Sequence, residues 1–320
     1  MKICVSGASG FIGSHFLRRV MNDTDHTVRA LVRNTDQRNL KRLQQPAIQR
    51  GILQGRIQVI YGDLLGDISG LCEGVDAVVH FAAKTYVDHS IKDASVFVKT
   101  NVLGTFHLLE EARRHKIKRF VQVSTDEVYG SILQGSYTEE APINPTNPYA
   151  ATKAGADALA ISYAHTYGLH TVISRTENNY GPNQHPQKVF PVFTKKALSD
   201  EPLPVYGDGG HVRQWLHVDD HVSGLFLLLE GNVPPGEVFH IAGNQELTNL
   251  ELARRILKGL NKPEGQIQHI DDHDIRPGHD RRYALNCDKL RALGWEPKVS
   301  LDVGIPATVE WYANNPWWSE

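Results

Sequence analysis

The sequence predicts an α/β protein in which a doubly wound parallel sheet is joined by a smaller C-terminal α/β substrate domain. Three features predict this fold class. The chain opens with an apolar strand, a glycine-rich turn and an amphipathic helix in immediate succession. Short strands then alternate with helices, as is typical of parallel sheets. Beyond about residue 176 this alternation stops and prolines become frequent, so we expect a second domain there.

The bulk composition is that of an ordinary globular protein. The chain has 320 residues, 41% hydrophobic and 22% charged, with a formal net charge of −2, which argues against nucleic-acid binding. Cys4, Cys72 and Cys287 are too widely spaced for a local metal site, and we expect no metal. No apolar run approaches the roughly 18 residues of a membrane span, and the N-terminus lacks a signal-peptide pattern. We expect a cytoplasmic protein that binds no membrane.

The N-terminal glycines predict a dinucleotide site. The strand 2–6 leads into Gly7, Gly10 and Gly13, and a helix is expected over about 11–21. In such a turn the first glycine allows the tight bend, the second lets the backbone approach a pyrophosphate, and the third allows close helix–strand packing. The helix N-terminus then attracts the anion. A glycine turn without a ligand is the alternative, but the flanking strand and helix favour a Rossmann-type site.

The second and third strands bear on the choice of cofactor. The strand Thr27–Val32 lacks a terminal acid for the ribose hydroxyls and is followed by Arg33. Arg33 could meet a 2′-phosphate, which would favour NADP over NAD, or it could be a surface residue before a basic helix. The strand Ile57–Ile60 leads to Asp63, which is placed to accept a hydrogen bond from the adenine amino group.

The next elements extend the parallel sheet. The strand Ala77–Phe81 is followed by Ala82 and Ala83, small residues past which a dinucleotide could lie. A long helix is expected over Ala94–Lys116, with Thr100 on its cofactor side.

An acid pair follows the fifth strand, Arg119–Val123. The polar stretch Ser124–Gly130 contains Thr125, Asp126 and Glu127. Ligands of open α/β sheets bind at the carboxyl ends of the strands, so adjacent acids there suggest acid–base chemistry. We expect their like charges to raise one carboxyl pKa, which would keep one acid protonated. A solvated turn is the alternative for an isolated pair.

A tyrosine and a lysine follow on the next helix. Tyr149 and Lys153 stand at i and i+4 and therefore share one helix face. A lysine in this position can lower the pKa of the phenol, which could then act as a base, and can bind a nicotinamide ribose. The pattern alone is weak, and the upstream glycine turn strengthens it. A sixth strand is expected at Thr171–Arg175.

The C-terminal part divides the chain into two predicted domains. We expect a dinucleotide-binding domain over 1–177, a second domain over 178–320, and a segment near 213–240 that returns to the first. Residues 178–182 are expected to form a turn. Helices are expected near 249–260, 288–293 and 301–314.

Three arginines gather in the segment 276–283. Arg276, Arg281 and Arg282 suit a diphosphate, because guanidinium forks match phosphate oxygens. A solvated charge cluster is the alternative.

These motifs together resemble the extended short-chain dehydrogenase/reductase family and, within it, the dTDP-glucose 4,6-dehydratases. The resemblance covers nearly the whole chain. The segments that carry it are Gly7–Gly13, Phe81–Ala83 with Val87-Asp88, Thr125–Gly130, Asn147–Lys153, Asn178–Pro182, Leu203–Gly207, Arg213 and Arg276–Tyr283. The Thr-Asp-Glu triplet distinguishes the dehydratases from the family's 4-epimerases, which usually lack the acid pair.

The resemblance implies a redox-assisted dehydration of a nucleotide sugar, with dTDP-glucose as the expected substrate. Tyr149, assisted by Lys153 and Thr125, would take the proton of the 4-hydroxyl while a hydride passes from carbon 4 to the nicotinamide. Glu127 would remove the proton of carbon 5, and a protonated Asp126 would give its proton to the departing 6-hydroxyl. The hydride then returns to carbon 6, so the cofactor can stay bound. The product would be the 4-keto-6-deoxy sugar and water.

The resemblance also implies contact residues and an assembly. The catalytic residues would be Thr125, Asp126, Glu127, Tyr149 and Lys153. The cofactor, NAD or NADP, would be bound by Gly7, Gly10, Phe11, Ile12, Gly13, Arg33, Asp63, Leu64, Phe81, Ala82, Ala83, Thr100, Tyr149, Lys153 and Asn178. The nucleotide sugar would be bound by Thr85, Thr125, Asn179, Lys188, Val189, Pro204, Val205, Tyr206, Arg213, Asn249, Arg276 and His279. Related proteins form homodimers through the helices that correspond to Ala94–Lys116 and Tyr149–Tyr167.

One segment departs from the family pattern. The family usually reads Ala-Ala-Glu-Ser-His-Val-Asp-Arg-Ser where this chain has Lys84, Thr85, Tyr86 and His89 within Ala82–Ser90. Lys84 reverses a charge beside the predicted cofactor and sugar, whereas Thr85 keeps the hydroxyl. Two rival functions therefore stay open. One is another reaction of the family on a UDP- or GDP-sugar, namely dehydration, epimerisation or decarboxylation. The other is a non-catalytic dinucleotide-binding sensor.

Overall fold

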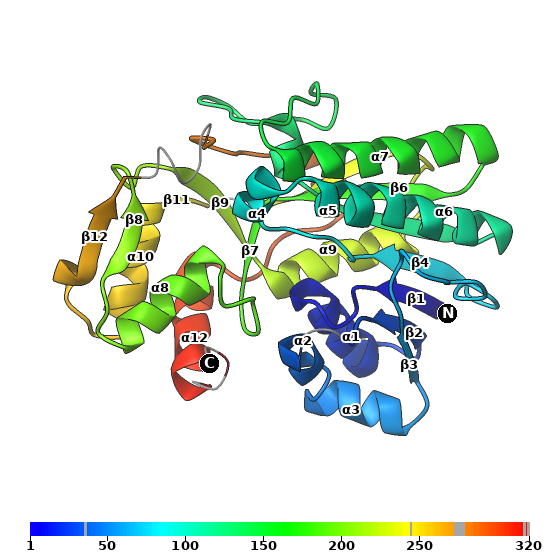
Figure 1. The fold of residues 1–320 in the computed structure, drawn as a ribbon, viewed down its shortest axis with the longest axis horizontal. Coiled ribbons are helices and arrows are strands. Elements are labelled where there is room, and N and C mark those ends of the chain that lie inside the picture. The colour runs from blue at the N-terminus through cyan, green and yellow to red at the C-terminus, as the bar shows by residue number, and fades with distance from the viewer. Residues whose placement is uncertain (35–36, 244, 272–278, 316–317, 319–320) are drawn as a thin grey trace.

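A seven-stranded parallel sheet organises the larger part of the molecule. The structure, a computed structural model, describes residues 1–34, 37–243, 245–271, 279–315 and 318 (Figure 1). The strands lie in the order β10-β6-β5-β4-β1-β2-β3, and every pairing is parallel. Their bounds are β1 Lys2–Ser6, β2 Thr27–Val32, β3 Ile57–Tyr61, β4 Ala77–His80, β5 Arg119–Thr125, β6 Thr171–Thr176 and β10 Val238–Ile241. The predicted doubly wound α/β fold is confirmed.

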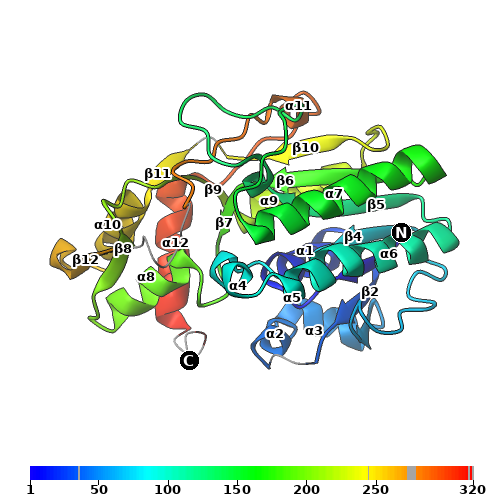
Figure 2. The ribbon, with the colours of Figure 1, turned by 45° about the horizontal axis from the view of Figure 1, so that its top comes forward.

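Helices cover both faces of this sheet (Figures 1 and 2). One face packs against α1, α3 and α9 through a core that includes Phe16, Ile48 and Leu225. The other face packs against α6 and α7 through a core that includes Leu108 and Phe120. The helices of this part are α1 Phe11–Asp23, α2 Gln37–Arg42, α3 Pro46–Leu53, α4 Val87–Lys92, α5 Ser95–Phe97, α6 Gly104–Arg114, α7 Pro148–Tyr167, α9 Val218–Glu230 and α11 Asp288–Arg291. Burial of strands on both faces explains their continuous apolar sequences.

A second group of elements, β8, β12, α8, α10 and α12, lies beside the large sheet (Figure 1). These elements pack around a second hydrophobic core. Its small sheets have the orders β11-β9-β7 and β12-β8. The elements of this part are β7 Asn178–Tyr180, α8 Val189–Leu198, β8 Leu203–Tyr206, β9 Val212–His217, β11 Glu246–Thr248, α10 Asn249–Gly259, η3 Glu264–Gln266, β12 Ile267–Ile270 and α12 Leu301–Asn314. Between β9 and β11 the chain crosses back to the large sheet, where α9 packs and β10 pairs with β6.

Two local predictions are wrong. Residues 178–180 form strand β7 instead of a turn, because Asn178 to Tyr180 pair in parallel with Trp215 to His217 of β9. That partner lies 37 positions away in the register Asn178↔Trp215, so local sequence could not show it. The helix expected over 94–116 is interrupted by a π-helical segment, η1 Val98–Leu103, between α5 and α6. Such π-helical segments occur frequently at functional sites, and η1 contains Thr100.

None of the helices in the described residues combines the length and the hydropathy that a membrane crossing requires. Strands β1, β4, β5 and β6 run in parallel and therefore end at the same edge of the sheet. The turn after β1, the loop after β4, the acids after β5 and the segment after β6 thus meet at one place.

Candidate active site

A cavity of about 440 Å³ opens at this edge of the sheet and extends toward the second core. Its volume is typical of a small-molecule site. It brings together all the predicted catalytic and cofactor residues, and from the predicted substrate residues it includes Thr85, Thr125, Asn179, Lys188 and Val189. Pro204, Val205, Tyr206, Arg213, Asn249 and His279 do not line it, and Arg276 lies outside the described residues.

The glycine turn has the geometry that a dinucleotide requires. Gly7 has φ 68°, and a Cβ added to it would lie 2.7 Å from the backbone nitrogen of Ala82. A Cβ on Gly13 would lie 2.4 Å from the carbonyl oxygen of Gly7. Helix α1 begins directly at the cavity, and the first N–H groups of a helix have no partner within it. This part of the cavity therefore fits an anionic pyrophosphate.

The adenosine end of the cavity carries both signs of charge. Arg33 Nη1 lies 3.8 Å from Asp63 Oδ2, and both side chains are partly exposed. Asp63 Oδ1 also accepts a hydrogen bond from the backbone N–H of Leu65 at 3.0 Å. Arg33 is thus drawn toward the carboxylate that is predicted to bind adenine.

The Thr-Asp-Glu triplet lies where β5 passes into a short 3-10 helix, η2 Asp126–Tyr129. The Thr125 hydroxyl donates to Asp126 Oδ1 at 3.0 Å and accepts from the backbone N–H of Glu127 at 3.3 Å. Glu127 Oε2 accepts from the side-chain amide of Asn147 at 3.3 Å, and Asn147 also caps helix α7. The two acids are therefore held by the strand end and by the start of the tyrosine-bearing helix.

Asp126 has the ionisation that the prediction requires. Only 4% of the residue is exposed. Burial, and then the charge of Glu127, raise the pKa of Asp126 to about 7. The like-charge effect expected from the sequence is present, but burial is the larger cause.

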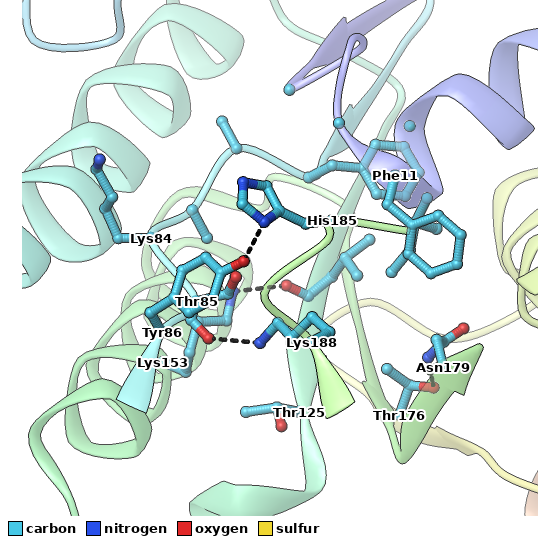
Figure 3. A pocket seen from close by; sticks show the side chains of 18 of the residues that line it. Phe11, Lys84, Thr85, Tyr86, Thr125, Lys153, Thr176, Asn179, His185 and Lys188 are labelled. Atoms are coloured by element: carbon cyan, nitrogen blue, oxygen red, sulfur yellow. Dashed lines mark hydrogen bonds between the residues drawn. The ribbon is translucent and has the colours of Figure 1, made fainter. Parts of the chain in front are cut away.

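Tyr149 and Lys153 line the same cavity but differ from expectation in one respect. The Lys153 ammonium donates to the carbonyl oxygen of Val123 at 2.7 Å (Figure 3), and burial lowers the pKa of Lys153 to about 8. Burial, and then the charge of Glu127, hold the pKa of Tyr149 well above its usual value, although a hydrogen bond with Thr125 acts in the opposite direction. The predicted lowering of the phenol pKa is therefore wrong for the protein without a bound ligand, because desolvation and the nearby carboxylates raise that pKa by more than the hydrogen bond with Thr125 lowers it.

The rim of the cavity is made by the loop after β4 and the segment between β7 and α8. The Tyr86 hydroxyl is hydrogen-bonded to His185 Nδ1, and Lys188 Nζ donates to the carbonyl oxygen of Thr85 at 2.9 Å. Lys84 is tied by its backbone to the Asn101 side chain at 2.8 and 3.0 Å. Figure 3 shows the Lys84 side chain pointing away from His185 and Lys188. The charge reversal at residue 84 thus lies at the margin of the rim.

A second polar group lies beyond the cavity. Arg213 lies over the Tyr283 ring at 4.4 Å, donates to the carbonyl oxygen of Asp280 at 2.9 Å and is 3.2 Å from His279 Nε2. The ring centroids of His279 and Tyr206 are 6.3 Å apart. Arg213, Tyr206 and His279, all predicted to bind substrate, are therefore together.

Other residues that were predicted to bind substrate or diphosphate make contacts within the protein instead. Val205 is fully buried in the second core, and the Asn249 backbone N–H donates to the carbonyl oxygen of His211 at 3.0 Å. Two arginines of the predicted diphosphate loop are engaged elsewhere, since Arg281 pairs with a carboxylate of Asp208 at 2.7 Å and Arg282 with Glu246 at 2.6 Å. For these two arginines the charge-cluster alternative holds.

Sequence reasoning missed several cavity residues: Asn39, Arg42, Glu177, Gln184, His185 and Trp215. Arg42 is only 2% exposed, and its guanidinium donates to the carbonyl oxygen of Ser9, in the glycine turn, at 3.2 Å. Glu177 accepts from the backbone N–H of Gly243 at 2.5 Å. The basic character of segment 38–42 and the position of Glu177 directly before Asn178 were the available signals. The contacts themselves depend on distant residues.

Comparison with known proteins identifies the family. A model of the GDP-mannose 4,6 dehydratase family matches residues 4–308. A dTDP-glucose 4,6-dehydratase of Streptomyces niveus is 46% identical over 99% of this chain and 95% of its own length. The structure of DesIV, a dTDP-glucose 4,6-dehydratase from Streptomyces venezuelae solved with NAD bound, matches with a TM-score of 0.91 at 44% identity, over 100% of this chain and 99% of that chain. A UDP-glucuronic acid 4-epimerase from Bacillus cereus, solved with UDP-glucuronic acid and NAD, has a TM-score of 0.90 at 30% identity, over 98% of this chain and 99% of that chain.

The fold and the cavity define an extended short-chain dehydrogenase/reductase, with a dinucleotide-type glycine turn and a Tyr/Lys pair at one edge of a parallel sheet. The chain belongs to the GDP-mannose 4,6 dehydratase family. The predicted resemblance to the dTDP-glucose 4,6-dehydratases is confirmed.

Proposed function

We propose that this protein is an NAD-dependent hydro-lyase that removes water from dTDP-glucose to give the 4-keto-6-deoxy sugar. The observation that carries the proposal is the acid pair Asp126-Glu127 beside Tyr149 in one cavity, with the pKa of Asp126 raised to about 7. A 4-epimerase needs no acid pair, and a sensor needs neither the pair nor the Tyr/Lys face. The names of the curated relatives support the substrate and the reaction.

The glycine turn fits the cofactor, as the space left by the absent Cβ atoms indicates. Gly7, Gly10 and Gly13 would hold its pyrophosphate, and Lys153 its nicotinamide ribose. The bound nicotinamide supplies the acceptor, and later the donor, of a hydride.

The residues of the chain divide the proton transfers among them. Tyr149 would accept the proton of the sugar's 4-hydroxyl as a phenolate, which requires that the positive charge of the bound nicotinamide lower the raised phenol pKa of the free protein. Thr125 orients that hydroxyl. Once carbon 4 is a ketone, the proton on carbon 5 becomes acidic, and Glu127 removes it. Asp126 gives its proton to the 6-hydroxyl, which leaves as water. Glu127 then returns its proton to carbon 5 as carbon 6 receives the hydride, which completes the 4-keto-6-deoxy product. A base and an acid are needed side by side, which explains the adjacent carboxyl groups.

The experiment is mass spectrometry of dTDP-glucose, UDP-glucose and GDP-mannose, each incubated with the purified protein without added cofactor. We expect dTDP-glucose alone to lose one water. The variant Glu127→Gln should lose this activity while it still oxidises carbon 4, which appears as reduced-nicotinamide absorbance. The exposed neighbour Glu140 provides the control Glu140→Gln. A sugar that is epimerised, or that stays unchanged with intact dinucleotide bound, would refute the dehydratase assignment.

We also propose a homodimer, and a division into domains 1–177 and 178–320 in which a segment near 213–240 returns to the first domain. Large apolar side chains are exposed along α5, η1 and α6, namely Val96, Val98, Leu103 and Phe106, which are between 39% and 50% exposed. Such a patch is typical of an interaction surface. In sedimentation experiments Phe106→Glu should shift the protein toward the monomer, whereas Leu53→Glu, at an 85% exposed site on α3, should not.

A further inference from the structure

One tyrosine joins the two segments that form the rim of the cavity. Tyr86 belongs to the loop after β4, and its hydroxyl is hydrogen-bonded to His185 Nδ1 from the segment before α8 (Figure 3). The two rings meet edge to face, with their centroids 5.2 Å apart. The centroid of the Tyr86 ring also lies 5.1 Å from that of the His89 ring on α4. The position of the Tyr86 ring is therefore fixed by contacts from both segments and from α4.

The face of the same ring meets a cation. Lys188 Nζ lies 4.8 Å from the centroid of the Tyr86 ring. The ammonium also donates to the carbonyl oxygen of Thr85, the residue before Tyr86, at 2.9 Å. Figure 3 shows Lys188 directed across the cavity toward Thr85 and Tyr86. Two consecutive residues of one loop thus hold the ammonium group that the opposite segment supplies.

This arrangement matters because lysine is a poor ligand when its side chain is free. The ammonium is a compact charge on a flexible stem, and ordering it opposes binding. A ring face attracts the ammonium, and the attraction grows when the pair is shielded from water. All four residues of the arrangement, Thr85, Tyr86, His185 and Lys188, line the cavity. The ammonium is therefore placed before any ligand arrives.

We propose that Tyr86 is a positioning residue that holds Lys188 ready for the anionic diphosphate of a nucleotide-sugar substrate, and that His185 holds Tyr86. The proposal rests on the proposed function for the identity of the ligand. It also explains the departure of this segment from the family pattern, since Tyr86 supplies an aromatic ring face and a hydroxyl at once. Under this proposal Tyr86 acts on substrate affinity and takes no part in the proton transfers.

The test compares two substitutions of one side chain. Tyr86→Phe keeps the ring and removes the hydroxyl that binds His185, whereas Tyr86→Leu removes both. The affinities for dTDP and for dTDP-glucose would be measured by calorimetry, alongside kcat and KM. We expect Tyr86→Leu to weaken both ligands roughly three- to thirtyfold, the range of a cation–π contact, and Tyr86→Phe to weaken them by a smaller factor. KM should rise by a similar factor with kcat nearly unchanged, because the contact is equal in the ground and transition states.

A double-mutant cycle separates positioning from a general structural role. If Tyr86 acts through Lys188, the double variant Tyr86→Leu/Lys188→Met should bind dTDP no more weakly than Lys188→Met alone. Tyr61→Leu is the matched control, because Tyr61 is 61% exposed at the end of β3 and does not line the cavity. Full additivity of the two changes, or unchanged binding by Tyr86→Leu, would overturn the proposal.

Failure of the Tyr86 proposal can be distinguished from failure of the proposed function. If the unaltered protein binds dTDP but eliminates no water from dTDP-glucose, the dehydratase assignment fails, while the cycle on dTDP still tests Tyr86. If the unaltered protein binds none of dTDP, UDP and GDP, the positioning proposal is overturned as well.

Discussion

The floor and the rim of the cavity are built by different means. The floor groups Thr125, Asp126 and Lys153 are at most 7% exposed. Lys153 donates to the backbone of β5, and Thr125, which accepts from the backbone N–H of Glu127, donates to Asp126. The rim groups Tyr86 and Lys188 lie on loops and are held by contacts with other side chains and a loop carbonyl. The catalytic groups are therefore positioned by the sheet itself. The groups that contact the substrate at the rim depend on pairs of residues that can change without altering the fold.

The largest expected effect is on catalysis at the floor. Asp126→Asn keeps a neutral polar side chain of nearly equal size but cannot donate the proton to the leaving hydroxyl. We expect kcat for dehydration to fall roughly 10²- to 10⁴-fold, the usual contribution of a general acid. Because the acid must be protonated and its pKa is raised to about 7, the unaltered protein should lose activity as the pH rises through about 7. A pH profile of kcat measures this limb, and an unchanged alkaline limb in the residual activity of the variant would contradict the assigned role.

The same substitution should stabilise the fold. In the folded protein the pKa of Asp126 is about 7, above its ordinary value of 3.8, so the folded state binds the proton more tightly than the unfolded state. The stability of the unaltered protein therefore falls as the pH rises from about 4 to 7. At pH 8 Asp126→Asn should raise the free energy of unfolding by up to about 4 kcal/mol, and near pH 4 by almost nothing. Urea unfolding of both proteins at both pH values tests this, and an equal difference at pH 4 and pH 8 would contradict it.

The floor of the cavity could largely be predicted from the sequence. Its residues follow strands that local apolar runs reveal, and the parallel order places all strand ends at one edge. Thr125, Asp126 and Glu127 were therefore expected at this edge, and the family resemblance added Tyr149 and Lys153. All five residues line one cavity. The ionisation of Tyr149 was not predictable, because burial and the charge of Glu127 act through space.

Parts of the rim and of the second core could not be predicted, for a related reason. Tyr86 and His185 are 99 positions apart and meet through one side-chain bond, which leaves no periodic signal. Strand β7 exists only because β9 lies beside it. Arg281 was grouped with the diphosphate arginines, yet a bidentate pair with Asp208 holds it. In each case the partner lies in another element and sets the role of the residue.

A substitution in the glycine turn should have an effect of intermediate size on stability and cofactor binding. Gly13→Ala places a methyl group 2.4 Å from the carbonyl oxygen of Gly7 and 3.1 Å from Ala8 Cα, and both are backbone atoms that cannot rotate away. We expect a loss of roughly 1–3 kcal/mol in the free energy of unfolding and a reduced amount of NAD that copurifies. Gly155→Ala in α7 is the matched control, since its Cβ would meet only Val102 Cγ2 at 3.5 Å. It should be neutral or stabilising by up to about 1 kcal/mol. Equal behaviour of the two variants would show that the turn is not tightly packed.

The smallest effect is expected from Arg33, at the adenosine end of the cavity. Its ion pair with Asp63 spans 3.8 Å between partly exposed side chains, and such pairs contribute about 0–1 kcal/mol. With NAD as the cofactor, Arg33→Ala should leave NAD affinity within about threefold. The affinity for NADP, whose 2′-phosphate Arg33 could contact, should fall by up to about fivefold more than the affinity for NAD, roughly the effect of one exposed charge contact. Titration of both dinucleotides into protein stripped of cofactor measures this. If the unaltered protein prefers NADP and Arg33→Ala reverses that preference, Arg33 binds the 2′-phosphate. One exposed side chain at the adenosine end would then determine cofactor choice, as side chains of the rim determine substrate affinity.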